Sequence, residues 1–197
     1  MAAVLALAGC ESDSAATADD GPSVVAPGKP GEAAQTLSAD EAKKAVGDDS
    51  PNSADFGYVQ RMIKHHRQAL VMTGLAEKHA QSGTVRRLAD RISAAQGPET
   101  KAMQGWQKRN GGPGEHAGHD HGAMPGMATG EQLAELREAR GRAFDELFLK
   151  LMITHHQGAV TMATELLSDG NNVLVEEMAN DVIAQQTSEI NRMRGMS

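Results

Sequence analysis

Cysteine is almost absent from this chain of 197 residues, since Cys10 is its single cysteine. One cysteine cannot form a disulfide within the chain or a thiolate metal cluster, so neither organises the domain. Aromatic residues make up only 3% of the chain, which disfavours a large sheet. Residues that favour helices, such as Ala, Leu, Met, Glu and Gln, are frequent instead. We therefore predict an all-α protein.

Clustered positive charge is also missing. The formal net charge is -7, and no run of Lys or Arg interrupts the sequence. Nucleic-acid-binding proteins and proteins that bind membrane surfaces by charge carry such clusters, so we predict no nucleic-acid partner. The length suits one domain of ordinary size with a segment left over for a tail.

Methionine is abundant, with 11 residues, and one stretch of the chain occurs twice. The segment from Asp55 to Met72 returns 90 positions later as Asp145 to Met162, in the ungapped frame Asp-x6-Met-x2-His-His-x2-Ala-x2-Met. At about 100° per residue these positions share one face of a helix, and basic residues lie opposite. A bundle would bury the face that carries the imidazoles and thioethers.

The repeat continues into a second helix of each half, because the frame Gln-x2-Glu-x3-Met at Gln96 returns at Gln186. Folding each half as a hairpin brings these glutamine and glutamate residues level with the histidine pair. Two such hairpins pack most simply as a four-helix bundle. The expected helices cover residues 53–81, 84–108, 131–168 and 173–194, with a kink at Gly97–Pro98.

Residues 1–10 end in Leu-Ala-Gly-Cys, which resembles the lipobox of bacterial lipoproteins. The positively charged region of a secretory signal is missing, so we expect the true start to lie upstream. The alternative is a short hydrophobic N-terminus on a cytosolic protein. We predict a truncated lipoprotein-type signal with Cys10 as the lipidated residue. The protein would then be exported and anchored in the membrane at the outer face of the cell, extracellular or periplasmic.

The remaining chain divides into a tether and one domain. Residues 11–51 have little to bury and are predicted to be disordered, apart from a short helix that begins at Ser38-x-x-Glu41 and ends near Val46. Residues 52–196 form the bundle domain, as hairpin 52–109, linker 110–130 and hairpin 131–196. Three histidines and two methionines lie in the Gly-rich linker, and short His-rich tracts commonly bind metal.

Copper is the metal that fits these side chains best. Thioether sulfur is soft and imidazole is borderline, so a pocket that offers both without thiolate suits copper better than Mg²⁺, Ca²⁺ or Mn²⁺. In an oxidising compartment thiols are lost to disulfides, which leaves Met and His as durable copper ligands. We predict Cu(I), Cu(II) or both as the bound metal.

Other interpretations of the same residues stay open. Zinc could bind His and Glu but leaves the methionines unexplained. Di-iron bundles need more inward carboxylates than Glu99 and Glu189 supply. Methionines at helical spacing often fill a core, and an inward histidine is often a hydrogen-bonded core residue. Gln96, Glu99 and their repeats could orient the imidazoles. Asp55 and Asp145 could be ligands or could pair with Arg or Lys near the far end of the neighbouring helix, and the structural role is the favoured interpretation.

The candidate metal ligands lie on the repeated helix faces and in the linker. Neighbouring histidines are about 100° apart on a helix, so the two members of a pair need not bind the same ion. The candidates are Met62, His65, His66, Met72, Glu99, Met103, His116, His119, His121, Met124, Met127, Met152, His155, His156, Met162, Glu189 and Met193.

The two histidine frames, the His- and Met-rich linker and the Gln-x2-Glu-x3-Met frames together resemble the bacterial family called domain of unknown function 305. The resemblance covers about Asn52 to Met196. It implies a ferritin-like four-helix bundle, and it favours copper because some members are exported copper-binding proteins linked to copper tolerance. It implies no particular activity.

Three functions are compatible with the sequence. The first hypothesis is an extracytoplasmic protein that sequesters or carries copper without turnover, as in copper tolerance. The second is a ferritin-like oxidase acting on Cu(I) or Fe(II), and the third is a structural or interaction bundle that binds no metal. The sequence indicates metal ions and, through Cys10, a membrane as partners, and it does not identify the protein that delivers or receives copper.

Overall fold

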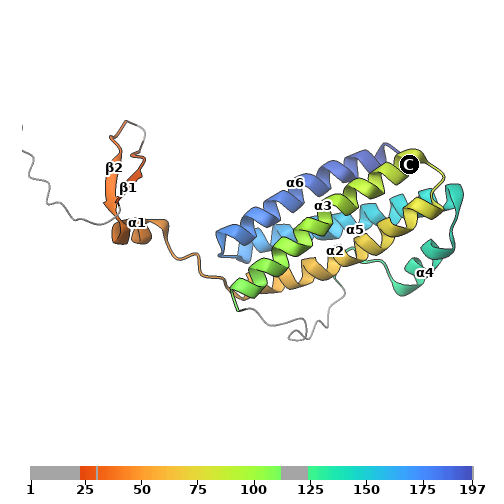
Figure 1. Cartoon of the computed structure of the whole chain (residues 1–197), viewed down its shortest axis with the longest axis horizontal. Helices are drawn as coiled ribbons and strands as arrows, with labels where there is room; N and C mark the ends of the chain where they lie inside the picture. The colour runs from red at the N-terminus through yellow and green to blue at the C-terminus, as the bar shows by residue number, and fades with distance from the viewer. Residues whose placement is uncertain (1–22, 30, 112–123, 197) are drawn as a thin grey trace, which may run out of the picture. The chain divides into compact units, whose positions relative to one another are not determined.

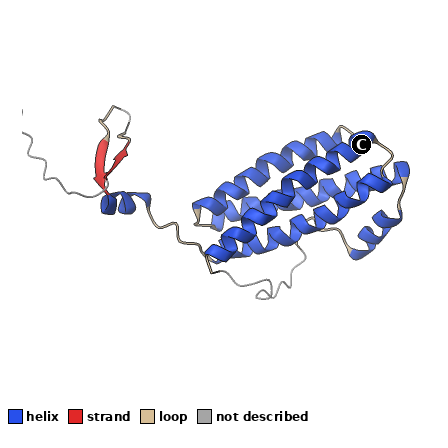
Figure 2. Cartoon of the chain, viewed as in Figure 1, coloured by secondary structure: helices blue, strands red, loops and turns tan. Residues whose placement is uncertain are grey.

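The computed structural model describes residues 23–29, 31–111 and 124–196, and the chain divides into the units Met1–Asp48 and Asp49–Ser197. In the second unit four long helices lie side by side (Figure 1). They are α2 (Ser53–His79), α3 (Gly83–Arg109), α5 (Gly141–Asp169) and α6 (Val173–Arg194). Almost all regular structure in the described residues is helical (Figure 2), so the all-α prediction is confirmed.

The four helices form two hairpins, α2 with α3 and α5 with α6, which meet through α2 and α5. An aspartate of each hairpin holds the turn of the other. The Asp145 carboxylate accepts a hydrogen bond from the backbone N–H of Ser82 at 2.8 Å, and Asp55 accepts one from Asn172 at 3.2 Å. The structural role expected for both aspartates agrees with these contacts, although their partners are backbone groups and not basic side chains.

Capping residues fix where several helices begin. Asn52 accepts hydrogen bonds from the N–H groups of Ala54 and Asp55, and Asp55 accepts one from the Asn52 N–H at 2.8 Å. The side chains of Thr129 and Gln132 form a capping box at the start of α4 (Gly130–Glu138). Helix α3 continues through Pro98 without interruption.

The single helix predicted over residues 131–168 is wrong, because the structure has two helices there, α4 and α5. The chain turns at Arg140, and Gly141 has φ +61°, a left-handed conformation that glycine adopts at little cost. The Arg140 guanidinium donates to the carbonyls of Arg137 and Ala139, which satisfies the C-terminal end of α4. Leu136 of α4 is fully buried against the bundle.

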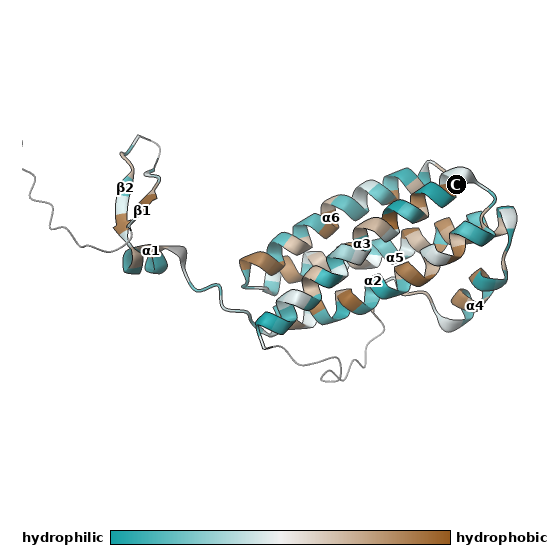
Figure 3. Ribbon diagram, viewed as in Figure 1, coloured by the Kyte–Doolittle hydropathy of each residue, from teal (hydrophilic) through white to brown (hydrophobic). Residues whose placement is uncertain are grey.

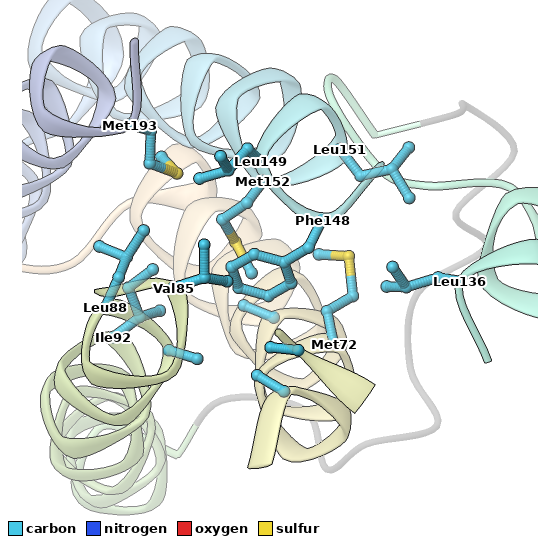
Figure 4. Close-up of a cluster of buried hydrophobic side chains, with 14 of the residues drawn as sticks. Met72, Val85, Leu88, Ile92, Leu136, Phe148, Leu149, Leu151, Met152 and Met193 are labelled. Atoms are coloured by element: carbon cyan, nitrogen blue, oxygen red, sulfur yellow. The ribbon is translucent and has the colours of Figure 1, made fainter. Parts of the chain in front are cut away.

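The apolar core of the bundle is divided into two clusters. The Phe148 cluster contains Phe148, Met72, Met152 and Met193 (Figure 4). The Trp106 cluster contains Trp106, Tyr58 and another three methionines, Met62, Met103 and Met162. Apolar residues are also exposed at the first turn of α6, which is brown in Figure 3 and carries Val173 and Leu174.

The first unit contains an antiparallel pair of short strands, β1 (Ser23–Ala26) and β2 (Gln35–Ser38), followed by α1 (Ala39–Val46). The capping box predicted at Ser38 is confirmed. The sequence predicts no regular structure between residues 11 and 35, whereas strands occupy part of that segment. Their side chains are mostly exposed, so backbone pairing forms the hairpin without the hydrophobic core that the sequence argument required.

None of the helices in the described ranges has the length and apolar character needed to cross a bilayer.

Candidate metal centre

Four imidazoles lie fully buried in the middle of the bundle. His65 and His66 come from α2, and His155 and His156 come from α5, each with 0% of its surface exposed. In α2 the pair follows Met62 of the Trp106 cluster and precedes residues of the Phe148 cluster. In α5 the residues before the pair belong to the Phe148 cluster, and those after it belong to the Trp106 cluster. The four histidines, with the buried Gln96 and Gln186 of α3 and α6, therefore form a polar layer between the two clusters. We call it the histidine layer.

Each half of the histidine layer contains a histidine held by a glutamate. His66 Nε2 lies 2.8 Å from Glu99 Oε2, and His156 Nε2 lies 2.7 Å from Glu189 Oε2. An ionised carboxylate can only accept, so Nε2 carries the proton in both rings and Nδ1 presents its lone pair. Such carboxylate–histidine pairs orient imidazoles that bind metals. The hairpin alignment thus correctly predicted that the glutamates face the histidines.

The other two histidines stack on each other across the α2–α5 interface. The ring centroids of His65 and His155 are 3.7 Å apart, with 35° between the ring planes. His65 Nε2 donates to the Pro125 carbonyl at 3.1 Å, because a carbonyl can only accept. Its Nδ1 therefore also carries a lone pair. The two halves of the histidine layer meet at this stacked pair.

Several polar atoms of the layer have no hydrogen-bond partner among the described residues. They are Nδ1 of all four histidines, Nε2 of His155, and both side-chain amide atoms of Gln96 and Gln186. Buried polar groups are usually paired, and each one left without a partner costs about 1–3 kcal/mol. A concentration of them in one layer points to a ligand, because a metal ion would use the imidazole lone pairs.

Burial keeps the central imidazoles neutral. Burial lowers the pKa of His65 to about 4. The hydrogen bond to Pro125 raises this pKa, and the nearby His66 and His156 lower it further. Burial also holds the pKa of His155 well below the usual range, the other three imidazoles lower that pKa further, and a contact with the His65 backbone opposes the shift. Neutral imidazole is the form that binds a metal, so both rings are competent well below pH 7.

Three buried methionines lie on either side of the histidine layer. Met62, Met103 and Met162 belong to the Trp106 cluster, and Met72, Met152 and Met193 belong to the Phe148 cluster. The repeat relates the two sets. Met62 corresponds to Met152 and Met103 to Met193, while Met162 corresponds to Met72. Each set therefore contains one methionine before a histidine pair, one after the other pair, and one from α3 or α6. The predicted bundle ligands are thus all buried or partly buried around one layer, but coordination by them stays a prediction.

Within the described parts of the chain, no three His, Cys, Asp or Glu side chains are grouped so that they could hold one ion. Methionine thioethers are not among these four residue types.

The end of the linker docks directly over the histidine layer. Besides the contact of His65 with Pro125, the Gln68 side chain donates to the Ala128 carbonyl at 2.9 Å and accepts from the Ala128 N–H at 2.7 Å. A Cβ atom at Gly158 would overlap the Pro125 carbonyl, so the absence of a side chain there permits the close approach. Met124, beside Pro125, packs against the Trp106 cluster.

The structure does not place every predicted site residue at the bundle. Met127 is partly buried in the docked linker end. The linker histidines His116, His119 and His121 and the predicted lipidation site Cys10 lie outside the described residues.

Tyr58 and Met178 are not among the predicted site residues, although each differs from its counterpart in the other half of the repeat. Tyr58 corresponds to Phe148 and Met178 corresponds to Leu88, both at the spacing of 90. The Tyr58 hydroxyl is buried and has no hydrogen-bond partner among the described residues. Burial raises its pKa, and the charge of Glu99 raises that pKa further.

Comparison with known proteins agrees with this architecture. The family described as "Domain of unknown function (DUF305)" matches residues 55–197. The chain belongs to the DUF305 family. It is 34% identical to a DUF305 fragment from Deinococcus radiodurans, over 74% of this chain and 96% of that one, with a TM-score of 0.67. None of the curated proteins matches the chain.

Two further solved structures carry functional information. A DUF305 protein of Streptomyces coelicolor that is assumed to be secreted is 31% identical over 73% of this chain and 90% of that one, with a TM-score of 0.67. CopM in its Cu(I)-bound form is 28% identical over 72% of this chain and 94% of that one, with a TM-score of 0.59. CopM also has Cu(II)-bound and silver-bound forms. These similarities support a metal-related role for DUF305 proteins of this kind.

Proposed function

We propose that this DUF305 protein binds copper outside the cytoplasm and sequesters or carries it, with the ions held by the histidine layer and the methionines beside it. The observation that carries the proposal is the set of four fully buried imidazoles whose Nδ1 atoms have no hydrogen-bond partner among the described residues. Six buried methionines flank them.

The donor set fits copper, and Cu(I) in particular. Neutral imidazole and thioether are ligands that soft, monovalent copper accepts, and neither has to lose a proton at pH 7 when it is buried as His65 is. An ion in the core would need a balancing charge. Glu99 and Glu189 lie directly behind His66 and His156 and supply it while holding the imidazole orientation.

The linker adds a second, more exposed set of donors. Its three histidines precede Pro125 closely in the sequence, and Pro125 contacts His65 of the histidine layer. We infer that the linker captures copper, including Cu(II), and that the bundle retains it. Similarity to a protein assumed to be secreted supports export. Lipid anchoring at Cys10 rests on the sequence Leu-Ala-Gly-Cys.

Competition titrations of the whole chain test the proposal, with Cu(I) under reductant and with Cu(II) in air. We expect binding tighter than about micromolar for Cu(I). A variant with His116, His119 and His121 changed to Asn should lose Cu(II) affinity and keep most of its Cu(I) affinity. Binding of both ions weaker than micromolar would contradict the proposal. A variant that loses all Cu(I) affinity would show that the linker, and not the bundle, holds the metal.

The anchor requires a separate test in cells that express the protein. Cys10→Ala should move the protein from the membrane fraction to the soluble fraction, because the lipid attachment site is removed. An unchanged distribution would rule out Cys10 as the anchor while leaving the copper proposal intact.

A further inference from the structure

A cavity of about 370 Å³ opens between α3 and α6, beside the histidine layer. Helix α3 contributes Glu99 and Met103 to its wall, and α6 contributes Met178 and Asp181. Two methionines and two acidic residues therefore line one opening, and the described lining residues include no basic residue. Neither Met178 nor Asp181 belongs to the repeated frames that define the candidate ligands.

Glu99 connects this cavity to the buried imidazoles. One of its carboxylate oxygens accepts from His66 at 2.8 Å, and its side chain is 26% exposed, so one end of the residue is in the core while part of it reaches solvent. Its counterpart Glu189 makes the equivalent bond to His156 but is only 6% exposed. The first half of the histidine layer thus has a connection to solvent that the second half lacks.

The repeat shows that Met178 is not required by the fold. The equivalent position of the first hairpin is Leu88, which is 1% exposed and packs in the Phe148 cluster. Met178 is instead partly exposed and packs at the edge of the Trp106 cluster, which also contains Met103. A leucine would fill the same space, so the thioether adds a soft donor at the surface end of a path that already contains Met103.

We propose that this cavity is an entry site for a soft monovalent cation, Cu(I), on its way to the histidine layer. The carboxylates of Asp181 and Glu99 attract the cation, and the thioethers of Met178 and Met103 bind it as it loses water. The ion then passes to His66, which Glu99 already contacts. This inference rests on the proposed function and adds the route by which the metal enters.

Two measurements on the whole chain test the entry site, and each uses a defined ion. Ag(I) is added in increasing amounts, beyond the amount that fills the histidine layer, to protein with ¹³C-labelled methionine methyl groups, and the shifts of individual methyl signals are followed by NMR. We expect the signal of Met178 to shift as well as those of the buried methionines, because its thioether also binds the ion. Cu(I) uptake from a coloured chelator, followed by stopped flow, should be about tenfold slower in Met178→Leu, because one of two entry thioethers is lost.

Matched variants separate entry from general effects. Met196→Leu removes a partly buried methionine outside this cavity and should leave the uptake rate unchanged. Asp181→Asn should slow uptake about two- to threefold at low salt, with the difference disappearing at about 1 M salt, where charges are screened. Asp181 is exposed, so this variant tests the site even if Met178→Leu folds poorly.

The outcomes distinguish this inference from the proposed function. If the wild type takes up Cu(I) but the Met178 signal stays unshifted while buried methionines respond, the entry site is wrong and copper binding stands. Equal uptake rates in Met178→Leu and Met196→Leu would overturn it in the same way. If the wild type takes up neither ion, the proposed function fails together with the inference.

Discussion

The two hairpins of this protein share a framework but differ in how their sites are reached. Both hold a histidine with a glutamate, and both use an aspartate to fix the turn of the partner hairpin. Two differences between the hairpins lie beside these contacts. Gln68 of the first half bonds to the linker, whereas the corresponding Gly158 of the second half makes room for the linker. Met178 of the second half lines a cavity, whereas the corresponding Leu88 of the first half is buried.

The comparison separates what the fold needs from what access to the site needs. Residues identical in both halves, such as the histidine pairs and the glutamates, build the buried layer. Among the positions that differ, Gln68 and Gly158 lie where the layer meets the linker, and Met178, which corresponds to Leu88, lines the cavity between α3 and α6.

The largest effect expected is on the stability of the metal-free protein in acid. An unfolded His65 takes up a proton below its ordinary pKa of 6.5, whereas the folded residue resists until about pH 4. Stability is therefore intact above pH 6.5 and is lost as pH falls toward 4, by about 3 kcal/mol from this residue. His155, whose pKa is also depressed, adds to the loss.

Denaturant unfolding of the metal-free protein between pH 7 and 4 measures this effect. His65→Leu should flatten the pH dependence, because the buried ring whose pKa is lowered is removed. Equal slopes in wild type and His65→Leu would mean that His65 is protonated in the folded protein.

The next largest effect concerns the two turn aspartates, which should behave alike. Asp55→Asn and Asp145→Asn each place an amide where a carboxylate accepts backbone N–H groups, so each should destabilise the fold by about 2 kcal/mol. Asp90→Asn, at an exposed position of α3, should change stability by less than about 0.5 kcal/mol. Thermal unfolding measures all three. A clear loss of copper affinity in either turn variant at temperatures where it is folded would indicate that the aspartates are ligands.

A smaller effect should mark the half that receives the linker. Gly158→Ala introduces a Cβ that overlaps the Pro125 carbonyl, so the linker end must shift and release His65. We expect a loss of about 1–2 kcal/mol. Gly74→Ala is the matched control, because nothing lies within 4 Å of its Cβ, and it should stabilise α2 by up to about 1 kcal/mol. If Gly158→Ala is also stabilising, the docked linker end contributes nothing to the fold.

Much of the architecture could be predicted because the repeat and helical periodicity act over whole helices. Met62, His66 and Met72 share a face by arithmetic, and the hairpin alignment paired His66 with Glu99. The break at Arg140–Gly141 was missed because one glycine inside an apolar pattern is normally tolerated in a helix. The hydrogen bonds between Gln68 and Ala128 depend on the path of the linker, which helical periodicity cannot predict. The entry cavity depends on how closely α3 and α6 approach, which is a property of the packed bundle.

We propose that the buried imidazoles are retained to bind metal and not to stabilise the core. His155 tests it most directly, because neither of its ring nitrogens has a hydrogen-bond partner among the described residues. We propose measuring, on one preparation of His155→Leu, both the free energy of unfolding without metal and the Cu(I) affinity. Replacing an unpaired buried ring by an apolar side chain should leave stability unchanged or raise it. Loss of one ligand should weaken Cu(I) binding at least about tenfold. Unchanged Cu(I) affinity, together with a destabilised metal-free protein, would contradict the account and make His155 a structural residue.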